Sequence, residues 1–213
     1  MKKKKPVTDS VRDAEERWGV PFERKRTVAL WQEEIVRCTT GQFAGLDKGY
    51  RRHCGPTAIT NLILTLNRRY GYLEDPVPSD VFSAVSRIGQ RMGIYWNTEF
   101  LGHIGGTYDI LTELYIRSCM RYFGIPVRMR WYAFPSETQF IRALDAGKIL
   151  FLQLHHNPCY GSHHLLCYGY TAVHSTEGKR EIYLLLADGW NRRTRYLRLK
   201  GRGICHFFAV DCK

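Results

Sequence analysis

The last third of the chain alternates short apolar segments with turn residues, and this pattern limits the possible folds more than any other feature. The apolar and aromatic segments cover residues 148–154, 163–172, 181–187, 194–200 and 204–210. Turn residues such as Asn157-Pro158 and Asp188-Gly189 separate them. Segments of this length between turn signals are typical of β-strands. Because short connections favour antiparallel pairing, we expect an antiparallel meander.

The preceding two thirds of the chain carry helical patterns. The segment from Pro56 to Arg69 has one apolar face, formed by Ala58, Ile59, Leu62, Ile63 and Leu66. This spacing predicts a helix that ends before Gly71. Further helices are expected near Ser79, near Thr107, and at residues 136–147, where Ser136 to Gln139 has the form of a capping box. Helices followed by a meander define the α+β class.

Length and composition favour one folded domain. The chain has 213 residues, of which 44% are hydrophobic, enough for one substantial core. Residues 1–25 are polar and basic, so we expect a loose N-terminal arm with a short helix around residues 11–18, and a single domain over residues 26–213. The opening lysines precede no apolar stretch, and a membrane span needs about 20 apolar residues. We therefore expect a cytoplasmic protein without a membrane partner.

The net charge and the cysteine content exclude few classes of function. The net charge is +12, which attracts acidic partners, but no groove-reading or RNA-stacking motif accompanies it. We therefore expect no specific nucleic-acid partner. The seven cysteines are expected to be reduced, because a chain of this length without a secretory signal does not need disulfides. Most of them should serve as small core residues.

Cys54 is the strongest candidate for a reactive residue. It precedes Gly55 and Pro56 at the start of the expected helix, where unpaired N–H groups and the helix dipole favour a thiolate. Gly55 would allow a substrate to approach the backbone closely, and Pro56 suits a first helical turn. The simpler interpretation is a structural cysteine at a helix start.

Two further stretches supply partners for such a thiol. A paired histidine, His163 and His164, begins an expected strand after a turn, where a ring can deprotonate Cys54 and later protonate a leaving amine. Asp188 ends another strand before Gly189 and Trp190, so it could orient the imidazole. A surface or core histidine and a turn aspartate are the simpler alternatives.

In this order, the three stretches resemble the papain superfamily of cysteine peptidases, most closely its bacterial bacteriocin-processing-peptidase-like branch. The resemblance rests on Cys54-Gly-Pro-Thr-Ala before a helix, His163 six residues before Gly169, and Asp188-Gly-Trp, and it spans residues 42–200. It implies a helical half, with the cysteine on its central helix, packed against an antiparallel sheet. It also implies a Cys54, His163 and Asp188 triad without a cofactor or metal. His164 is the alternative base if the strand register shifts by one residue.

The oxyanion hole is where the sequence departs from the family. The family's glutamine lies six residues before the cysteine, and Lys48 occupies that position here. Gln42 could reach the same place through a longer loop, and the N–H of Cys54 would be the second donor. The implied reaction is cleavage of an amide bond in a peptide or protein, with an acidic substrate suggested by Arg51 and Arg52.

Three other functions fit parts of the pattern. The same residues would serve a papain-fold acyltransferase or transglutaminase-like enzyme, in which an amine replaces water. A catalytically idle basic binding protein would keep the fold without the reaction. A zinc site could use a histidine and cysteine cluster, although the paired spacing of structural zinc sites is missing. Its candidate ligands are His155, His156, Cys159, His163, His164, Cys167, Cys205 and His206.

Overall fold

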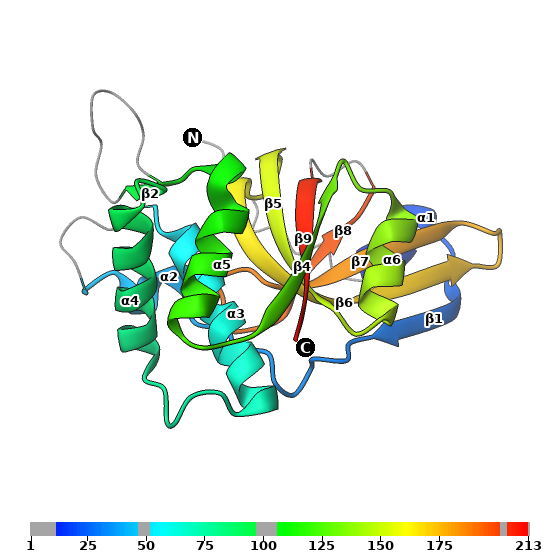
Figure 1. The fold of residues 1–213 in the computed structure, drawn as a ribbon. Coiled ribbons are helices and arrows are strands. Elements are labelled where there is room, and N and C mark those ends of the chain that lie inside the picture. Colours follow the sequence, from blue (N-terminus) through cyan, green and yellow to red (C-terminus); the bar gives the residue numbers. More distant parts are fainter. Residues whose placement is uncertain (1–11, 47–51, 97–105, 201–203, 213) are drawn as a thin grey trace.

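A seven-stranded antiparallel sheet forms the centre of the molecule (Figure 1). The computed structural model describes residues 12–46, 52–96, 106–200 and 204–212. The strands are β1 (Phe22–Val28), β4 (Val127–Ala133), β5 (Ile149–Asn157), β6 (Gly161–Ser175), β7 (Arg180–Ala187), β8 (Arg195–Arg198) and β9 (Ile204–Cys212). Their order is β4-β9-β5-β6-β7-β8, with β1 also paired to β6. Every pairing is antiparallel, which confirms that part of the sequence prediction.

The sheet differs from a simple meander in two ways. Strands β5 to β8 follow one another, but β9 returns to the other side and pairs with β5 instead of β8. Strands β1 and β4 were not expected from the sequence. Both carry charged side chains, and their burial patterns are mostly exposed or intermediate. Strand β1 lacks the apolar content by which the other strands are recognised, whereas β4 alternates apolar residues with Arg128 and Arg130 at the edge of the sheet.

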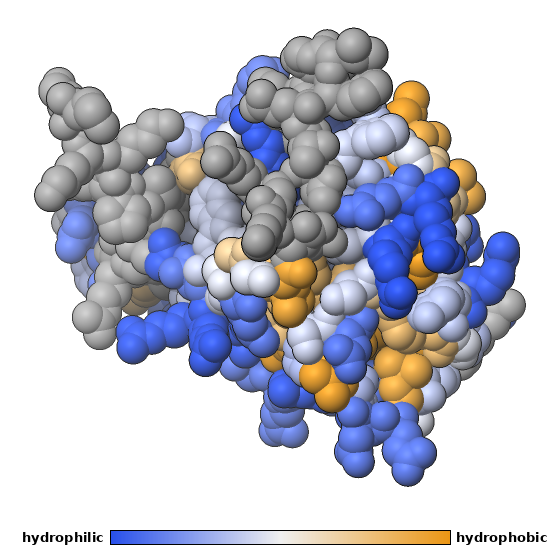
Figure 2. All heavy atoms as spheres, turned by 90° about the vertical axis from the view of Figure 1, so that its left-hand side faces the viewer, coloured by the Kyte–Doolittle hydropathy of each residue, from blue (hydrophilic) through white to orange (hydrophobic). Residues whose placement is uncertain are grey.

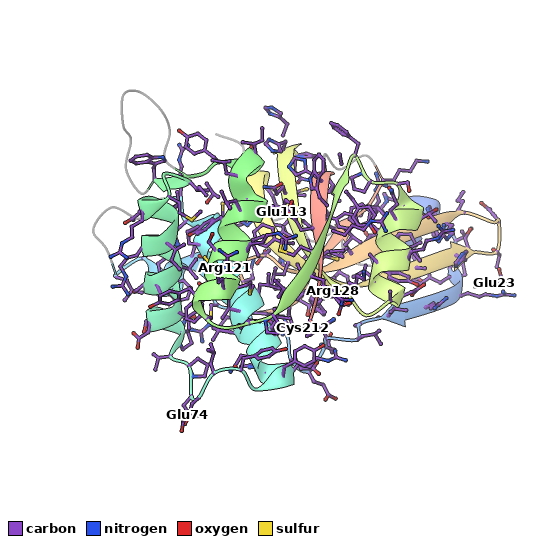
Figure 3. The ribbon with its side chains drawn as sticks, viewed as in Figure 1. Glu23, Glu74, Glu113, Arg121, Arg128 and Cys212 are labelled. Carbon is purple, nitrogen blue, oxygen red and sulfur yellow. The ribbon has the colours of Figure 1, made fainter. Side chains whose placement is uncertain are left out.

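Four longer helices complete the α+β fold: α3 (Cys54–Tyr70), α4 (Pro78–Arg91), α5 (Thr112–Tyr122) and α6 (Glu137–Asp145). Helix α3 ends at Gly71, which adopts the expected left-handed conformation. Helix α6 begins with the predicted capping box of Ser136 and Gln139. Helix α5 begins later than expected, and Thr107 lies in the short strand β3 (Gly106–Thr107), paired with β2 (Tyr95–Trp96). Figure 3 shows Glu113 and Arg121 near opposite ends of α5.

Apolar side chains cover both faces of the sheet. Alternate residues of β5 divide between two clusters: Ile149 and Phe151 pack with α3, α4 and α5, whereas Leu150, Leu152 and Leu154 pack with α6. Figure 1 shows the three helices on one side of the sheet and α6 on the other. The cluster with α3 lies directly behind the candidate nucleophile, so the first turn of α3 is anchored by a packed core.

The N-terminal segment differs from the expected loose arm. Residues 1–11 lie outside the described part of the chain. Helix α1 (Arg12–Trp18) and strand β1 then pack onto the sheet. Ala14 is fully buried and Arg17 forms an ion pair with Glu181 at 2.6 Å. The proposed domain boundary at residue 25 therefore falls inside β1, because pairing with β6 outweighs the strand's polar composition.

Figure 2 shows the face on the left of Figure 1, where hydrophilic side chains surround small apolar patches. Within the described ranges, no helix has both the length and the apolar content that a membrane crossing requires.

Candidate functional site

Cys54 is the first residue of α3, and its side chain is half-buried. The following glycine is needed for packing in this structure. A Cβ atom at Gly55 would lie only 2.1 Å from Thr107 Oγ1 of β3. The close approach expected from a substrate is therefore made here by Thr107, which holds β3 against the first turn of α3.

His164 is the histidine that faces Cys54. Its Nδ1 lies 3.6 Å from Cys54 Sγ. His164 pairs with Gln153 on β5, and both belong to the sheet face covered by α3. The ring is almost entirely buried. The structure therefore places an imidazole from the sheet against a thiol at a helix N-terminus.

Asp109 completes a chain of three residues. It begins the 3₁₀ helix η1 (Asp109–Leu111), and its Oδ1 lies 2.9 Å from His164 Nε2. Its second oxygen, Oδ2, lies 2.5 Å from His155 Nε2. Gln153 steadies this segment, because its amide donates to the carbonyl of Asp109 and to Thr112 Oγ1 at 2.6 Å. Each carboxylate oxygen of Asp109 thus contacts one histidine ring, and these two contacts fix the orientation of Oδ1 towards His164.

The pKa values of the three groups favour a charged pair. Burial raises the pKa of the Cys54 thiol, but hydrogen bonds and charge from His163 and His164 outweigh it, so this pKa lies well below the ordinary value. Burial lowers the pKa of His164, whereas Asp109 and Cys54 raise it to about 9. Burial also opposes ionisation of Asp109, yet its histidine neighbours lower the carboxyl pKa. At neutral pH these directions give a thiolate beside an imidazolium.

His163, the preferred base in the sequence analysis, has a different main partner. Its Nε2 lies 2.6 Å from the backbone carbonyl oxygen of Asp188, and its ring stacks on Tyr160 and contacts Trp190. A side-chain hydrogen bond from this ring is also the first of the causes that lower the pKa of Cys54, ahead of that from His164. His164, the alternative base, lies 3.6 Å from the thiol sulfur through its Nδ1.

A β-bulge lies between the two histidines and Gly169, the residue from which the family spacing to His163 is counted. The register of β6 against β7 shifts between Cys167 and Gly169. Leu166 and Tyr168 therefore pack towards α3, whereas Tyr170 packs on the opposite face. One inserted residue reverses the alternation of side chains. Alternation of side chains therefore does not carry from Gly169 back to the histidines without this shift.

Asp188 does not orient either histidine through its carboxylate. Its Oδ1 accepts hydrogen bonds from the backbone N–H groups of Trp190 and Asn191, and its Oδ2 accepts from the side chains of Asn191 and Tyr160. These contacts close the turn after β7. These contacts are those of a turn aspartate before glycine, and among the described residues no hydrogen bond joins this carboxylate to a histidine ring.

The expected oxyanion residue Gln42 lies near this turn without contacting the thiol. It belongs to the short helix α2 (Thr40–Phe43), where the N–H of Thr40 donates to the carbonyl of Gly189 at 2.7 Å. The Gln42 side chain is exposed and forms no hydrogen bond with any described residue. Lys48 lies outside the described residues. The first N–H groups of α3 have no carbonyl partner within the helix.

The remaining thiols behave as core or surface cysteines. Besides Cys54, the described ranges hold free thiols at Cys38, Cys119, Cys167 and Cys212, and the side chain of Cys205 is not described. Burial raises the pKa of Cys167 to about 12 and also raises that of Cys119. In the described part of the chain, no group of three or more His, Cys, Asp or Glu side chains is arranged to hold a metal ion.

Comparison of the chain with protein-family models, curated proteins and solved structures finds no match. The fold and the site therefore define this chain only as an α+β protein with a buried histidine facing a thiol at a helix start. Sequence reasoning identified Cys54 and named His164 as an alternative. It missed Asp109 and Gln153, because neither residue lies in a local motif and both reach the site only through folding.

Proposed function

We propose that this protein is a cysteine-dependent amide hydrolase of the papain-like kind. Cys54 would be the nucleophile, His164 the general base and acid, and Asp109 the carboxylate that orients the imidazole. The contact that carries the proposal is Cys54 Sγ to His164 Nδ1 at 3.6 Å, backed by His164 Nε2 to Asp109 Oδ1 at 2.9 Å. A base within reach of a thiol and itself oriented by a third group is the arrangement of an activated nucleophile.

The reaction divides into two steps. The Cys54 thiolate attacks the carbonyl carbon of an amide, and the N–H at the start of α3 stabilises the oxyanion. His164 Nδ1–H then protonates the leaving amine, the C–N bond breaks, and a thioester with Cys54 remains. Neutral His164 next removes a proton from water, which attacks the thioester and releases a carboxylic acid. The proton on His164 and the thiolate on Cys54 are thereby restored.

The order of the residues along the chain differs from the order implied by the papain resemblance. The proposed triad runs Cys54, Asp109, His164, whereas the resemblance implied the carboxylate after the histidine. Triads are defined by geometry and role, and their chain order varies among unrelated folds. The helix bearing Cys54 and the antiparallel sheet support the papain-like proposal at the level of architecture. The proposed carboxylate, Asp109, precedes the histidine in the sequence, and in this respect the chain differs from the papain-like pattern.

Thiol alkylation tests the proposal without knowledge of the substrate. We expect iodoacetamide to modify Cys54 at pH 6 much faster than Cys212, whose pKa is raised by burial. Cys212 lies at the far end of β9 (Figure 3), so it serves as an internal control. Mass spectrometry of peptides from the intact, folded protein would give both rates.

Two matched variants assign the base. His164→Asn should slow alkylation of Cys54 at pH 6 by removing the ring that contacts the sulfur. His163→Asn should have the smaller effect, because the main partner of that ring is the Asp188 carbonyl. Equal labelling of Cys54 and Cys212 in the native protein would contradict the proposal. A larger loss with His163→Asn would return the role of base to His163.

A further inference from the structure

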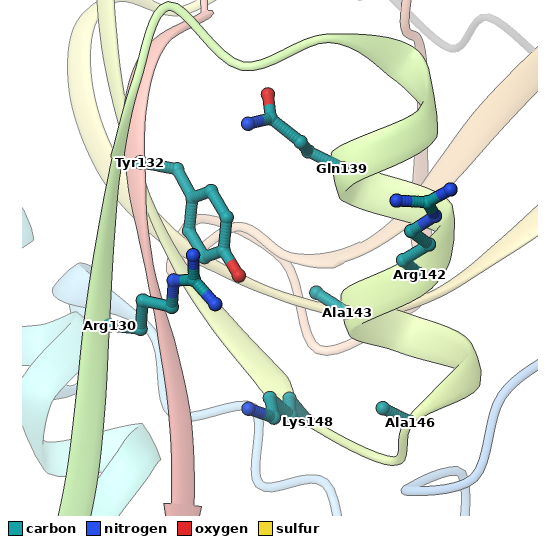
Figure 4. A pocket seen from close by; sticks show the side chains of 7 residues that line it. All are labelled: Arg130, Tyr132, Gln139, Arg142, Ala143, Ala146 and Lys148. Carbon is teal, nitrogen blue, oxygen red and sulfur yellow. The ribbon is translucent and has the colours of Figure 1, made fainter.

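A second, chemically different site lies between β4 and α6. It is a solvent-open pocket of about 320 Å³, a volume at the lower end of the range for small-molecule sites. The lining residues are Arg130, Tyr132, Gln139, Arg142, Ala143, Ala146 and Lys148. Figure 4 shows Arg130 and Tyr132 of β4 facing the residues of α6, with Lys148 at one end. Because the side chains of Ala143 and Ala146 are short, the space between β4 and α6 stays open.

The pocket holds positive charge without a compensating acid. Arg130, Arg142 and Lys148 form no ion pair with any described residue. The two acidic residues of α6 are engaged elsewhere: Glu137 pairs with Arg180, and Asp145 contacts Arg26 and Tyr170. Three like charges around one cavity repel one another, so an anion that enters it is stabilised by all three.

The pocket lies on the opposite side of the sheet from Cys54. Arg130 is paired across β9 with Ala209, which pairs in turn with Leu150, and the latter two side chains belong to the cluster under α6. His164 lies on the face covered by α3. Lys148 also precedes Gln153 by five residues along the chain, about 16 Å of extended strand. The pocket is therefore separate from the proposed thiol site.

We propose that this pocket binds a small molecule that carries a phosphate or diphosphate group. Two guanidinium groups offer paired N–H donors that match phosphate oxygens, and Lys148 adds a point charge. Figure 4 shows the Tyr132 hydroxyl and the Gln139 amide on the pocket side of their elements, as further polar groups. A volume of about 320 Å³ exceeds the size of a phosphate group alone, which leaves room for the organic part of an ester.

Calorimetric titration of the full chain with pyrophosphate and with adenosine diphosphate tests this site. We expect saturable binding of one equivalent. The variant R142Q/K148Q should weaken it by at least about tenfold, because two charge-assisted contacts are lost. The control R91Q/R121Q removes two exposed arginines outside the pocket and should leave the dissociation constant unchanged. Tighter binding of adenosine diphosphate than of pyrophosphate would assign the site to a phosphate ester. Equal binding of the two would assign it to the free anion.

A second pair of variants keeps every native cation in place. Ala146 is exposed and caps α6 with a φ of −78°, so a longer side chain fits its backbone. A146E should abolish binding by placing a carboxylate in the pocket, whereas A146Q should retain it. Absence of saturable binding, equal losses in R91Q/R121Q, or binding that strengthens with oligonucleotide length would each overturn the proposal. None of these results depends on the reactivity of Cys54.

Discussion

Replacing Asp109 with Asn tests the contact between its carboxylate and His164 Nε2, which spans 2.9 Å. The carboxylate stabilises the imidazolium, so the substitution should lower the pKa of His164 from its value of about 9. A hydrogen bond to a charged group contributes about 1.5–3 kcal/mol, equivalent to about one to two pKa units. The Asp109 side chain is only 29% exposed, which limits screening by solvent. We therefore expect a pKa of about 7 to 8 in D109N.

Nuclear magnetic resonance measures this pKa directly from the ring C–H signals, with H164Q identifying the resonance. Asp188→Asn is the matched control, because that carboxylate contacts Tyr160, Trp190 and Asn191 and no histidine ring. The His164 signal should therefore titrate near pH 9 in the control, as in the native protein. A signal that titrates at the same pH in D109N and native protein would refute the reasoning, since the carboxylate would then not support the imidazolium.

Three other substitutions probe the frame around the site. Gly55→Ala should destabilise the protein by about 1–3 kcal/mol in chemical denaturation, because the new methyl group overlaps Thr107, and Thr107→Ala should restore part of the loss. Asp188→Asn should cost about 1–3 kcal/mol of unfolding free energy through its lost turn contacts, while fast alkylation of Cys54 persists; slow alkylation would return Asp188 to the catalytic group. Ser136→Ala removes a capping box and should cost about 1 kcal/mol in the same denaturation assay, and an unchanged midpoint would contradict that role.

The parts of the fold that the sequence predicted are those with strong local signals. The apolar face of α3, its glycine end at Gly71 and the capping box at Ser136 are each encoded by neighbouring residues. Strands β5 to β7 were recognisable because apolar side chains fill both of their faces. Strand β1 has five exposed residues and becomes a strand only by pairing with β6. Its identity depends on a contact distant in sequence, which local patterns do not record.

The residues of the candidate site likewise divide into those with a local sequence signal and those without one. Cys54 could be singled out because a helix start is a local feature with a known effect on thiols. A bulge in β6 lies between the two histidines and Gly169. The sequence around Gly169 gives no signal for it, so alternation of side chains could not decide between His163 and His164. Asp109 lies 55 residues from both Cys54 and His164 along the chain. Its role follows only from the packing of η1 against β5 and β6.

The two histidines also explain why Cys54 differs from the other buried thiols of this chain. Burial alone raises the pKa of a thiol, as it does for Cys119 and Cys167. Burial acts on the pKa of Cys54 in the same direction, so a helix start would be a weak reason to expect a thiolate there. The low pKa requires the rings of His163 and His164, which approach from β6. Both histidines lie near the start of β6, where they pair with Leu154 and Gln153 of β5, and both are buried. The position of the histidine pair at the strand start is therefore the sequence feature on which the proposed reactivity depends most.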